Sequence, residues 1–207
     1  PPAANPPLPV APRAPVRSPP AASARPPARW QLVPSVDVLG GTGVLPHVAV
    51  GFQGGLAVHF PTHAGAAPWL VVRGAYWPRR STETLPEGRV DRLSFAALAC
   101  WGFGSGAPRL ALCAGVDAGR LTATAPELSG DRLFARAHLA VPVEGQFGLG
   151  PYRWGALGLE PRLTAQLATP LVRDRFTYDD AAKRETTLHQ AAPVTFQTSA
   201  GIAAHFF

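Results

Sequence analysis

The chain has 207 residues and a formal net charge of +6, and its hydrophobic residues (46%) far outnumber its charged ones (15%). Its 24 prolines and 21 glycines disfavour long helices, and no uninterrupted apolar run reaches the roughly 18 residues that a transmembrane helix needs. Four arginines lie within the first 29 residues, where there is no acid, and no helical basic face follows. The net charge therefore does not indicate nucleic-acid binding.

Residues 1–29 form a proline-rich segment that contains eleven prolines. Proline removes a backbone donor and fixes the backbone angle φ, so this segment cannot form a helix or a central strand. We expect a disordered, partly polyproline-II linker on the periplasmic side. The pattern P-x-x-P also occurs here, which leaves an SH3-type ligand as the alternative, but any proline-rich tract contains that pattern by chance.

From residue 30 onward, apolar and polar residues alternate. In residues 132–149, RLFARAHLAVPVEGQFGL, apolar residues such as Leu139 and Val143 occupy every second position, with Arg136 and His138 between them. Successive side chains of a β-strand point to opposite faces, so this period of two predicts strands with one apolar and one polar face. Eight such runs occur, at 30–38, 47–60, 69–78, 89–103, 109–121, 132–149, 153–172 and 194–207.

The connections between these runs differ in character. Residues 104–108 and 150–152 are tight turns and 61–68 contains small residues, whereas 80–88, 126–131 and 179–192 are polar. An even number of strands, with short turns at one end and charged loops at the other, is typical of up-and-down membrane barrels. The sequence therefore predicts an all-β fold over residues 30–207, an eight-stranded antiparallel transmembrane β-barrel.

Two features favour this barrel over a soluble β-sandwich. The polar faces of the runs are rich in glycine and charged residues, which suit a narrow lumen better than the exposed side of a sandwich strand. The aromatic residues also cluster at run ends, as in the two girdles of a membrane barrel. With a periplasmic N-terminus, one girdle comprises Trp30, Phe60, Trp69, Trp101, Phe103, Phe147, Trp154 and Phe206, and the other Tyr76, Trp77, Phe176, Tyr178 and Phe196.

Charged residues recur on the faces predicted to line the lumen. They are Asp37, Arg73, Arg92, Asp117, Arg132, Arg136, Glu144, Glu160 and Arg162, with His138 alongside. An isolated buried charge is costly, so these groups must pair or meet water. We expect a salt-bridged network that plugs the lumen; the alternative is a transient pore or a bound anion, because arginines outnumber acids.

On this pattern, residues 30–207 resemble the small eight-stranded outer-membrane β-barrels of the OmpA-like transmembrane class. The resemblance implies the outer membrane of a Gram-negative bacterium, and the arginine-rich composition suggests a GC-rich one. It also implies outer-membrane lipid, lipopolysaccharide and the barrel-assembly machinery as partners. The chain contains no Met, as expected of a mature product or an excised piece, so an upstream periplasmic domain of the same polypeptide is a further candidate partner.

Members of that class usually end in a phenylalanine on the lipid face, which is part of the signal for barrel assembly. This chain ends in His205, Phe206 and Phe207. Strand parity places Phe206 outward and Phe207 inward. Either the terminal residue departs from the pattern of the class, or a local bulge shifts the register.

The two cysteines fall at facing positions of adjacent runs. A turn at 104–108 pairs Trp101 with Leu112, and the same register places Cys100 opposite Cys113, both inward. In an oxidising periplasm we expect these cysteines to form a disulfide; the alternative is two thiols that fill lumen space. No His or acid at zinc-ligand spacing accompanies them, so we expect no metal site there.

Some barrels of this size modify lipopolysaccharide, which makes an acyl hydrolase or transferase an alternative. Such chemistry needs a nucleophile with a histidine and an acid near one rim. The candidates are His189 with Asp179, Asp180, Glu185 and Ser81 or Ser129. They lie in loops, and no G-x-S-x-G motif occurs, so we expect no enzyme and no cofactor.

The sequence therefore predicts a monomeric, porin-like barrel of the cell envelope with a structural or anchoring role. A lipid-modifying enzyme, a small pore and a soluble lipocalin-like binding barrel remain as alternatives.

Overall fold

A computed structural model describes residues 30–45, 47–61, 67–81, 89–103, 107–125, 132–173, 175–179 and 185–207. Of the side chains in these ranges, those of Ala67, Ala125, Arg132, Leu133, Tyr178, Asp179, Glu185, Thr186 and Leu188 are not described. The linker predicted for residues 1–29 lies outside the described residues. None of the described residues belongs to a helix long and apolar enough to cross a membrane.

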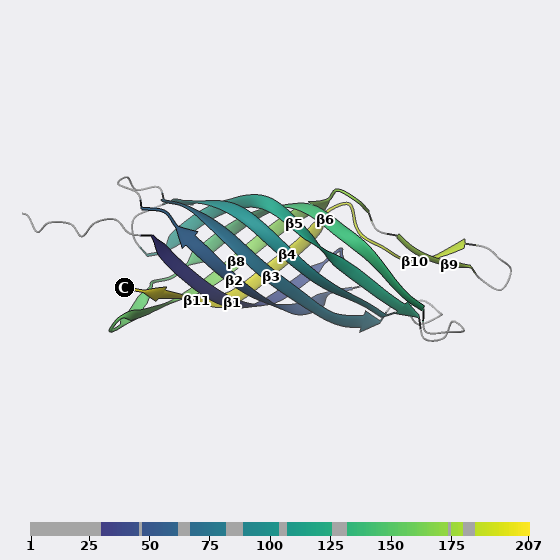
Figure 1. The fold of residues 1–207 in the computed structure, drawn as a ribbon, viewed down its shortest axis with the longest axis horizontal. Helices are drawn as coiled ribbons and strands as arrows, with labels where there is room; N and C mark the ends of the chain where they lie inside the picture. The colour runs from purple at the N-terminus through teal and green to yellow at the C-terminus, as the bar shows by residue number, and fades with distance from the viewer. Residues whose placement is uncertain are drawn as a thin grey trace, which may run out of the picture.

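The eight predicted runs form the eight strands of a closed antiparallel barrel (Figure 1). The strands are β1 (Gln31–Thr42), β2 (Ala49–His59), β3 (Ala67–Ser81), β4 (Arg89–Phe103), β5 (Arg109–Ala125), β6 (Arg132–Gly148), β8 (Leu157–Pro170) and β11 (Thr195–Phe206). Each strand pairs with the next in this order, and β11 pairs with both β8 and β1, which closes the sheet. The predicted all-β, up-and-down architecture is therefore confirmed.

The barrel has two distinct ends. The start of β1 and the end of β11 lie at the same end, which we call the terminal mouth, and Gln31 of β1 donates there to the carbonyl of Phe206 over 3.5 Å. At the opposite, loop end, β9 (Arg175–Asp179) and β10 (Glu185–Gln190) form a hairpin that projects beyond the barrel (Figure 1). Most of this hairpin falls within residues 179–192, for which the sequence predicts a polar loop.

The seventh predicted run is interrupted. Residues Tyr152–Trp154 form a short strand, β7, that folds back on β8 through a two-residue turn at Gly155 and Ala156. Gly155 has a φ of 63°, which a glycine adopts without the steric cost that a side chain would add. Alternation continues through this turn, so the run alone does not reveal the break.

The outer face of the barrel is apolar and exposed. Val36, Phe95 and Leu163 expose 67%, 60% and 56% of their surface, although side chains of this size are usually buried in a soluble protein. On β4 the outward apolar positions extend from Phe103 to Leu93. This distance is about 33 Å along the strand and about 25 Å along the barrel axis at a typical tilt of about 40°, the height of a membrane barrel's apolar band. Such an exterior argues against the soluble lipocalin-like alternative.

The aromatic girdles are only partly as predicted. At the terminal mouth, Trp30, Trp101, Phe103, Tyr152, Trp154 and Phe206 are exposed; toward the loop end, Tyr76 and Phe196 are exposed. Three predicted girdle residues instead lie inside: Trp69 stacks on His59, and Trp77 and Phe176 are buried. Trp69 and Trp77 stand at inward-facing positions of β3, the strand whose alternation of apolar and polar residues is the least regular. The side chain of Tyr178 lies outside the described residues.

The lumen is layered, which the alternation did not predict. One apolar cluster lies toward the terminal mouth and includes Val33, Val71, Leu98 and the two cysteines. A second lies at the loop end and includes Leu39, Trp77, Val90, Leu121 and Phe176. Along β1, β3, β4 and β5 the inward charged residues Asp37, Arg73, Arg92 and Asp117 fall between these two clusters. The interior is therefore a polar layer between two apolar ones, rather than a uniformly polar lumen.

If the outer face contacts hydrocarbon, an arginine in the middle of the band is costly. We predict that Val143→Arg, about midway along the outward face of β6, lowers the free energy of unfolding by about 2–4 kcal/mol. Thr122→Arg, beyond the loop-end edge of the band and next to Arg120, is the matched control with an expected cost of about 0–1 kcal/mol. Reversible urea unfolding from lipid vesicles measures both, and equal costs would contradict the assignment.

Candidate functional site

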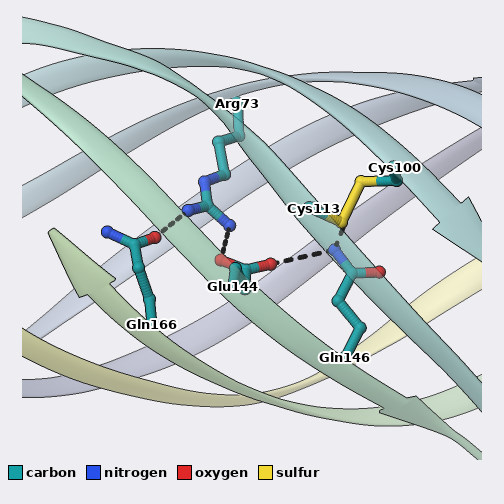
Figure 2. The surroundings of a disulfide bond; sticks show 6 residues. All are labelled: Arg73, Cys100, Cys113, Glu144, Gln146 and Gln166. Atoms are coloured by element: carbon teal, nitrogen blue, oxygen red, sulfur yellow. Dashed lines mark hydrogen bonds and ion pairs between the residues drawn. A yellow bond between two sulfur atoms is a disulfide. The ribbon is translucent and has the colours of Figure 1, made fainter.

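Arg73 and Glu144 meet at the centre of the polar layer. Arg73 comes from β3, and its Nη1 lies 2.5 Å from Glu144 Oε2 of β6, while its Nη2 donates to Gln166 Oε1 of β8 (Figure 2). Gln146 Nε2 donates to the other carboxylate oxygen of Glu144 over 2.9 Å. Both charged side chains are almost completely enclosed. The guanidinium of Arg73 thus connects β3 across the interior to both β6 and β8.

A second ion pair joins β1 to β8. Arg162 donates through Nε to Asp37 Oδ1 over 2.8 Å and through Nη2 to Asp37 Oδ2 over 2.6 Å. The same Nη2 lies 2.6 Å from Ser35 Oγ, and Gln53 of β2 donates to Asp37 over 3.2 Å. The carboxylate of Asp37 thus accepts two hydrogen bonds from Arg162 and one from the side-chain amide of Gln53. These bonds offset much of the free-energy cost of burying its charge.

A third ion pair, Arg92 with Asp117, joins neighbouring strands β4 and β5 nearer the loop end. Both side chains are buried. His138 of β6 is buried close to this pair. The three ion pairs use six of the nine charged residues predicted for the lumen.

The other three predicted residues lie elsewhere. Glu160 is at the terminal mouth, where its Oε2 is 3.2 Å from His205 Nε2 and 3.4 Å from Arg109 Nη1. Arg136 has inward parity on β6 but is exposed, because that end of the strand extends past the loop end of the band. It is therefore not an enclosed lumen charge. The side chain of Arg132 lies outside the described residues.

Sequence reasoning missed Arg109 as a member of this charged set. The outward parity of Leu110 and Leu112 already placed Arg109 inward, so the signal was present. The glutamines that complete the network, Gln146 and Gln166, also have inward parity. Alternation did not indicate that they contact the Arg73–Glu144 pair.

The disulfide is as predicted. Cys100 and Cys113 are bonded, with their Cα atoms 4.0 Å apart, and both are buried inside the barrel (Figure 2). The register that led to the prediction, Trp101 opposite Leu112, is also observed. The disulfide belongs to the apolar cluster nearer the terminal mouth, and Gln146 Nε2 lies 4.0 Å from Cys100 Sγ.

The two residues at the end of the chain lie on the sides that strand parity gives them. Phe206 faces outward and is exposed. The Phe207 ring lies on the inward side of the mouth, beside the inward His205 ring (centroids 6.3 Å apart) and against Gly158, with about half of its surface open to solvent. The β8–β11 register runs without a shift to the pair of Phe206 and Leu157, so no bulge is involved. Phe207 follows the last strand residue, donates its amide to the carbonyl of Ala156 over 3.0 Å, and carries the Arg153 guanidinium 3.7 Å above its ring.

The candidate catalytic residues at the loop end do not form a described triad. His189 Nε2 lies 2.7 Å from the carbonyl of Val44, and Ser81 is an exposed residue at the end of β3. Asp179 and Glu185 pair across the β9–β10 hairpin, but their side chains, like Asp180 and Ser129, lie outside the described residues. The contact of His189 helps to anchor the hairpin to the barrel. Burial of Phe176 and the 2.7 Å hydrogen bond from the Ala192 amide to the carbonyl of Gly43 also anchor it.

Because Arg73 and Glu144 are enclosed, removing one should cost more than removing both. We predict that Arg73→Met lowers the free energy of unfolding by about 3–5 kcal/mol, since it leaves a buried carboxylate without its cation. The double variant Arg73→Met/Glu144→Met removes both charges and should lose less stability. Urea unfolding measures the free energy of unfolding of both variants. A double variant that is less stable than the single one would contradict this prediction.

Burial lowers the pKa of His189 below its ordinary value of 6.5, with the Val44 carbonyl acting in the opposite direction. The contribution of neutral His189 to the stability of the hairpin is therefore fully present above about pH 6.5. It is lost as the pH falls through the lowered pKa of His189. We predict that the hydrogen-exchange protection factor of the Ala192 amide falls on acidification over this range. His189→Gln, which keeps a donor but does not titrate, should remove the pH dependence; a fall of the same size in this variant would show that His189 is not its cause.

No protein-family model matches the sequence, and no curated protein matches it. Among the solved structures with a similar fold are three that are each 10% identical to this chain. Neisserial surface protein A (NspA) has a TM-score of 0.51, over 86% of this chain and 97% of its own. Ail, the attachment invasion locus protein of Yersinia pestis, has a TM-score of 0.52, over 87% and 99%. A major outer membrane protein from Thermus thermophilus has a TM-score of 0.54, over 86% and 99%.

At 10% identity, the similarity to these structures concerns the fold alone. It does not test whether the source bacterium is GC-rich, which stays a prediction. The closed order of strands, the apolar exterior and the similarity to these solved structures all indicate the same fold. The chain has the fold of the small eight-stranded outer-membrane β-barrels.

Proposed function

We propose that this chain is an outer-membrane barrel with a structural, anchoring role, and that its own side chains plug its lumen. One observation carries the proposal: large apolar side chains are exposed around a closed sheet, while the central charges are paired inside it. In hydrocarbon every backbone donor and acceptor needs a partner within the protein, and a closed barrel supplies one. A soluble protein with the same exterior would expose an unusually large apolar surface.

The plug is supported by the layered interior. An ion passing from the loop end would meet the apolar cluster around Leu39, Trp77 and Leu121, which is almost inaccessible to solvent. It would then meet charged groups that already bond to one another across the lumen. Eight strands leave an interior that side chains can fill, so a permanent channel is not expected.

The two ends suggest how the barrel lies in the membrane. We place the terminal mouth in the periplasm and the loop end outside, so that the N-terminal segment enters from the periplasm. Arg120 is exposed on the outer face of β5, opposite Leu93, at the loop-end edge of the apolar band. A cation there can pair with lipid or lipopolysaccharide phosphates. The exposed Phe206 suits recognition by the barrel-assembly machinery, and an upstream domain of the same polypeptide would be what the barrel anchors.

The proposed role includes no lipid-modifying chemistry. A nucleophile would need a histidine free to take its proton, whereas His189 bonds to a backbone carbonyl in the hairpin anchor. The three solved structures compared above are a Neisserial surface protein, an attachment invasion locus protein and a major outer membrane protein, and none of these three names describes an enzyme.

Planar-bilayer recording of the refolded chain separates a plugged barrel from a small pore. We predict no steady single-channel current from the wild type, although its faster gel mobility before heating should show that it is folded. The variant Leu39→Gly/Leu121→Gly, which empties the loop-end apolar cluster, should conduct more than the wild type. The matched control Leu112→Gly/Leu163→Gly changes only outward positions and should stay closed. Steady current in proportion to the amount of wild-type barrel inserted would contradict the plug.

A further inference from the structure

A cavity of about 300 Å³ lies inside the terminal mouth of the barrel. Its walls include His59, Trp69, Arg109, Glu160, Arg162 and His205. Val33, Ala57 and Ala203, which belong to the apolar cluster of the disulfide, form its inner end. The cavity is therefore a blind recess at the lower end of the size range of ligand sites, about 300–1,000 Å³. The ion pairs of the polar layer do not use it, apart from Arg162.

One wall of the cavity is flat and aromatic. The rings of His59 on β2 and Trp69 on β3 are stacked, with their centroids 4.9 Å apart and their planes within 5°. His59 and Trp69 face each other directly in the strand register, so the backbone holds the stack in place. Stacking leaves one face of the Trp69 indole uncovered by His59, and a planar ligand can stack on that face with little loss of conformational freedom.

The other wall carries Arg109, a cation that can donate further hydrogen bonds to a ligand. Arg109 Nη1 is 3.4 Å from Glu160 Oε2, longer than the about 2.7–2.9 Å of a good charged hydrogen bond, and its side chain is 47% exposed. Glu160 has a second contact, with His205 at 3.2 Å. Arg162, by contrast, already bonds to Asp37 and Ser35. The planar fork of Arg109 is thus the group best placed to receive an anion.

The charges at the cavity limit what that anion can be. Glu160 lies beside Arg109 and would repel a dianion such as phosphate. A carboxylate carries one negative charge and matches the guanidinium fork. The Arg153 guanidinium is held over Phe207 and does not line the cavity, so it is not a candidate for this contact.

We propose that the cavity at the terminal mouth binds a small organic monocarboxylate with a flat ring. Its carboxylate pairs with Arg109, and its ring stacks on the face of Trp69 that is turned away from His59. This activity is separate from anchoring, and it does not depend on the orientation of the barrel in the membrane.

The test uses the full chain with 15N-labelled tryptophan in zwitterionic detergent micelles, titrated with benzoate. Of the five tryptophans, Trp69 should show a saturable shift of its indole N–H signal, whereas the exposed Trp30, Trp101 and Trp154 should not. Benzyl alcohol, which has the ring but no charge, should bind at least tenfold more weakly, and inorganic phosphate should not shift Trp69. Similar shifts at all the rim tryptophans would mean partition into the micelle and would overturn the proposal.

Two variants make the test specific. Arg109→Gln should weaken benzoate binding at least tenfold. Arg109→Lys keeps the charge but not the planar fork of the guanidinium, so its affinity for benzoate should lie between those of Arg109→Gln and the wild type. Arg153→Gln, at the same mouth but outside the cavity lining, should leave the affinity unchanged. Loss of binding in Arg153→Gln, or unchanged binding in Arg109→Gln, would overturn the assignment of the carboxylate to Arg109.

Discussion

The hydrogen bonds between β1 and β11 are the interaction on which the rest of the structure depends. They join the first and last barrel strands, from Ser35 opposite Ala203 to Thr42 opposite Phe196, and leave the barrel sheet without an open edge. An open edge in hydrocarbon would carry a row of unpaired backbone groups, each with a cost of several kcal/mol. Once the sheet is closed, every strand residue faces either the surroundings or a lumen of eight-strand width. The two-residue alternation of the sequence follows from that division.

The lumen shows how a small barrel keeps charges inside. Each described central cation has a carboxylate partner. Two of the pairs, Arg73 with Glu144 and Arg162 with Asp37, join strands that are not neighbours in the sheet. Such pairs add little net stability against an apolar filling, because desolvation offsets much of their attraction. They do make wrong arrangements expensive, since a slip of one residue would turn these charges toward the outer face. The apolar layers on both sides restrict water around them.

Alternation predicted those properties that depend on one residue and its neighbours in sequence. It placed all eight barrel strands, the outward set and the facing cysteines, because side-chain direction in a strand has a fixed period of two. It could not predict which inward groups meet, such as Arg73 with Gln166, because this depends on how the strands are staggered around the barrel. The layering was missed for a related reason: Val33 and Leu98 share the inward parity of the charged residues, and their apolar character alone does not distinguish the two faces. Parity holds as far as Phe207, whose ring lies beside the inward His205 although it follows the last paired residue.

The central claim is that the apolar flank of each strand contacts acyl chains while the opposite flank is enclosed by protein. Nuclear Overhauser effects between lipid acyl-chain protons and protein methyl groups, measured for the chain in lipid nanodiscs, test it most directly. Exposed methyls such as those of Val72 and Leu163 should give strong lipid cross-peaks, and those of Leu98 and Leu121 should give none. Lipid contacts at Leu98 and Leu121, together with their absence at Val72 and Leu163, would contradict the account.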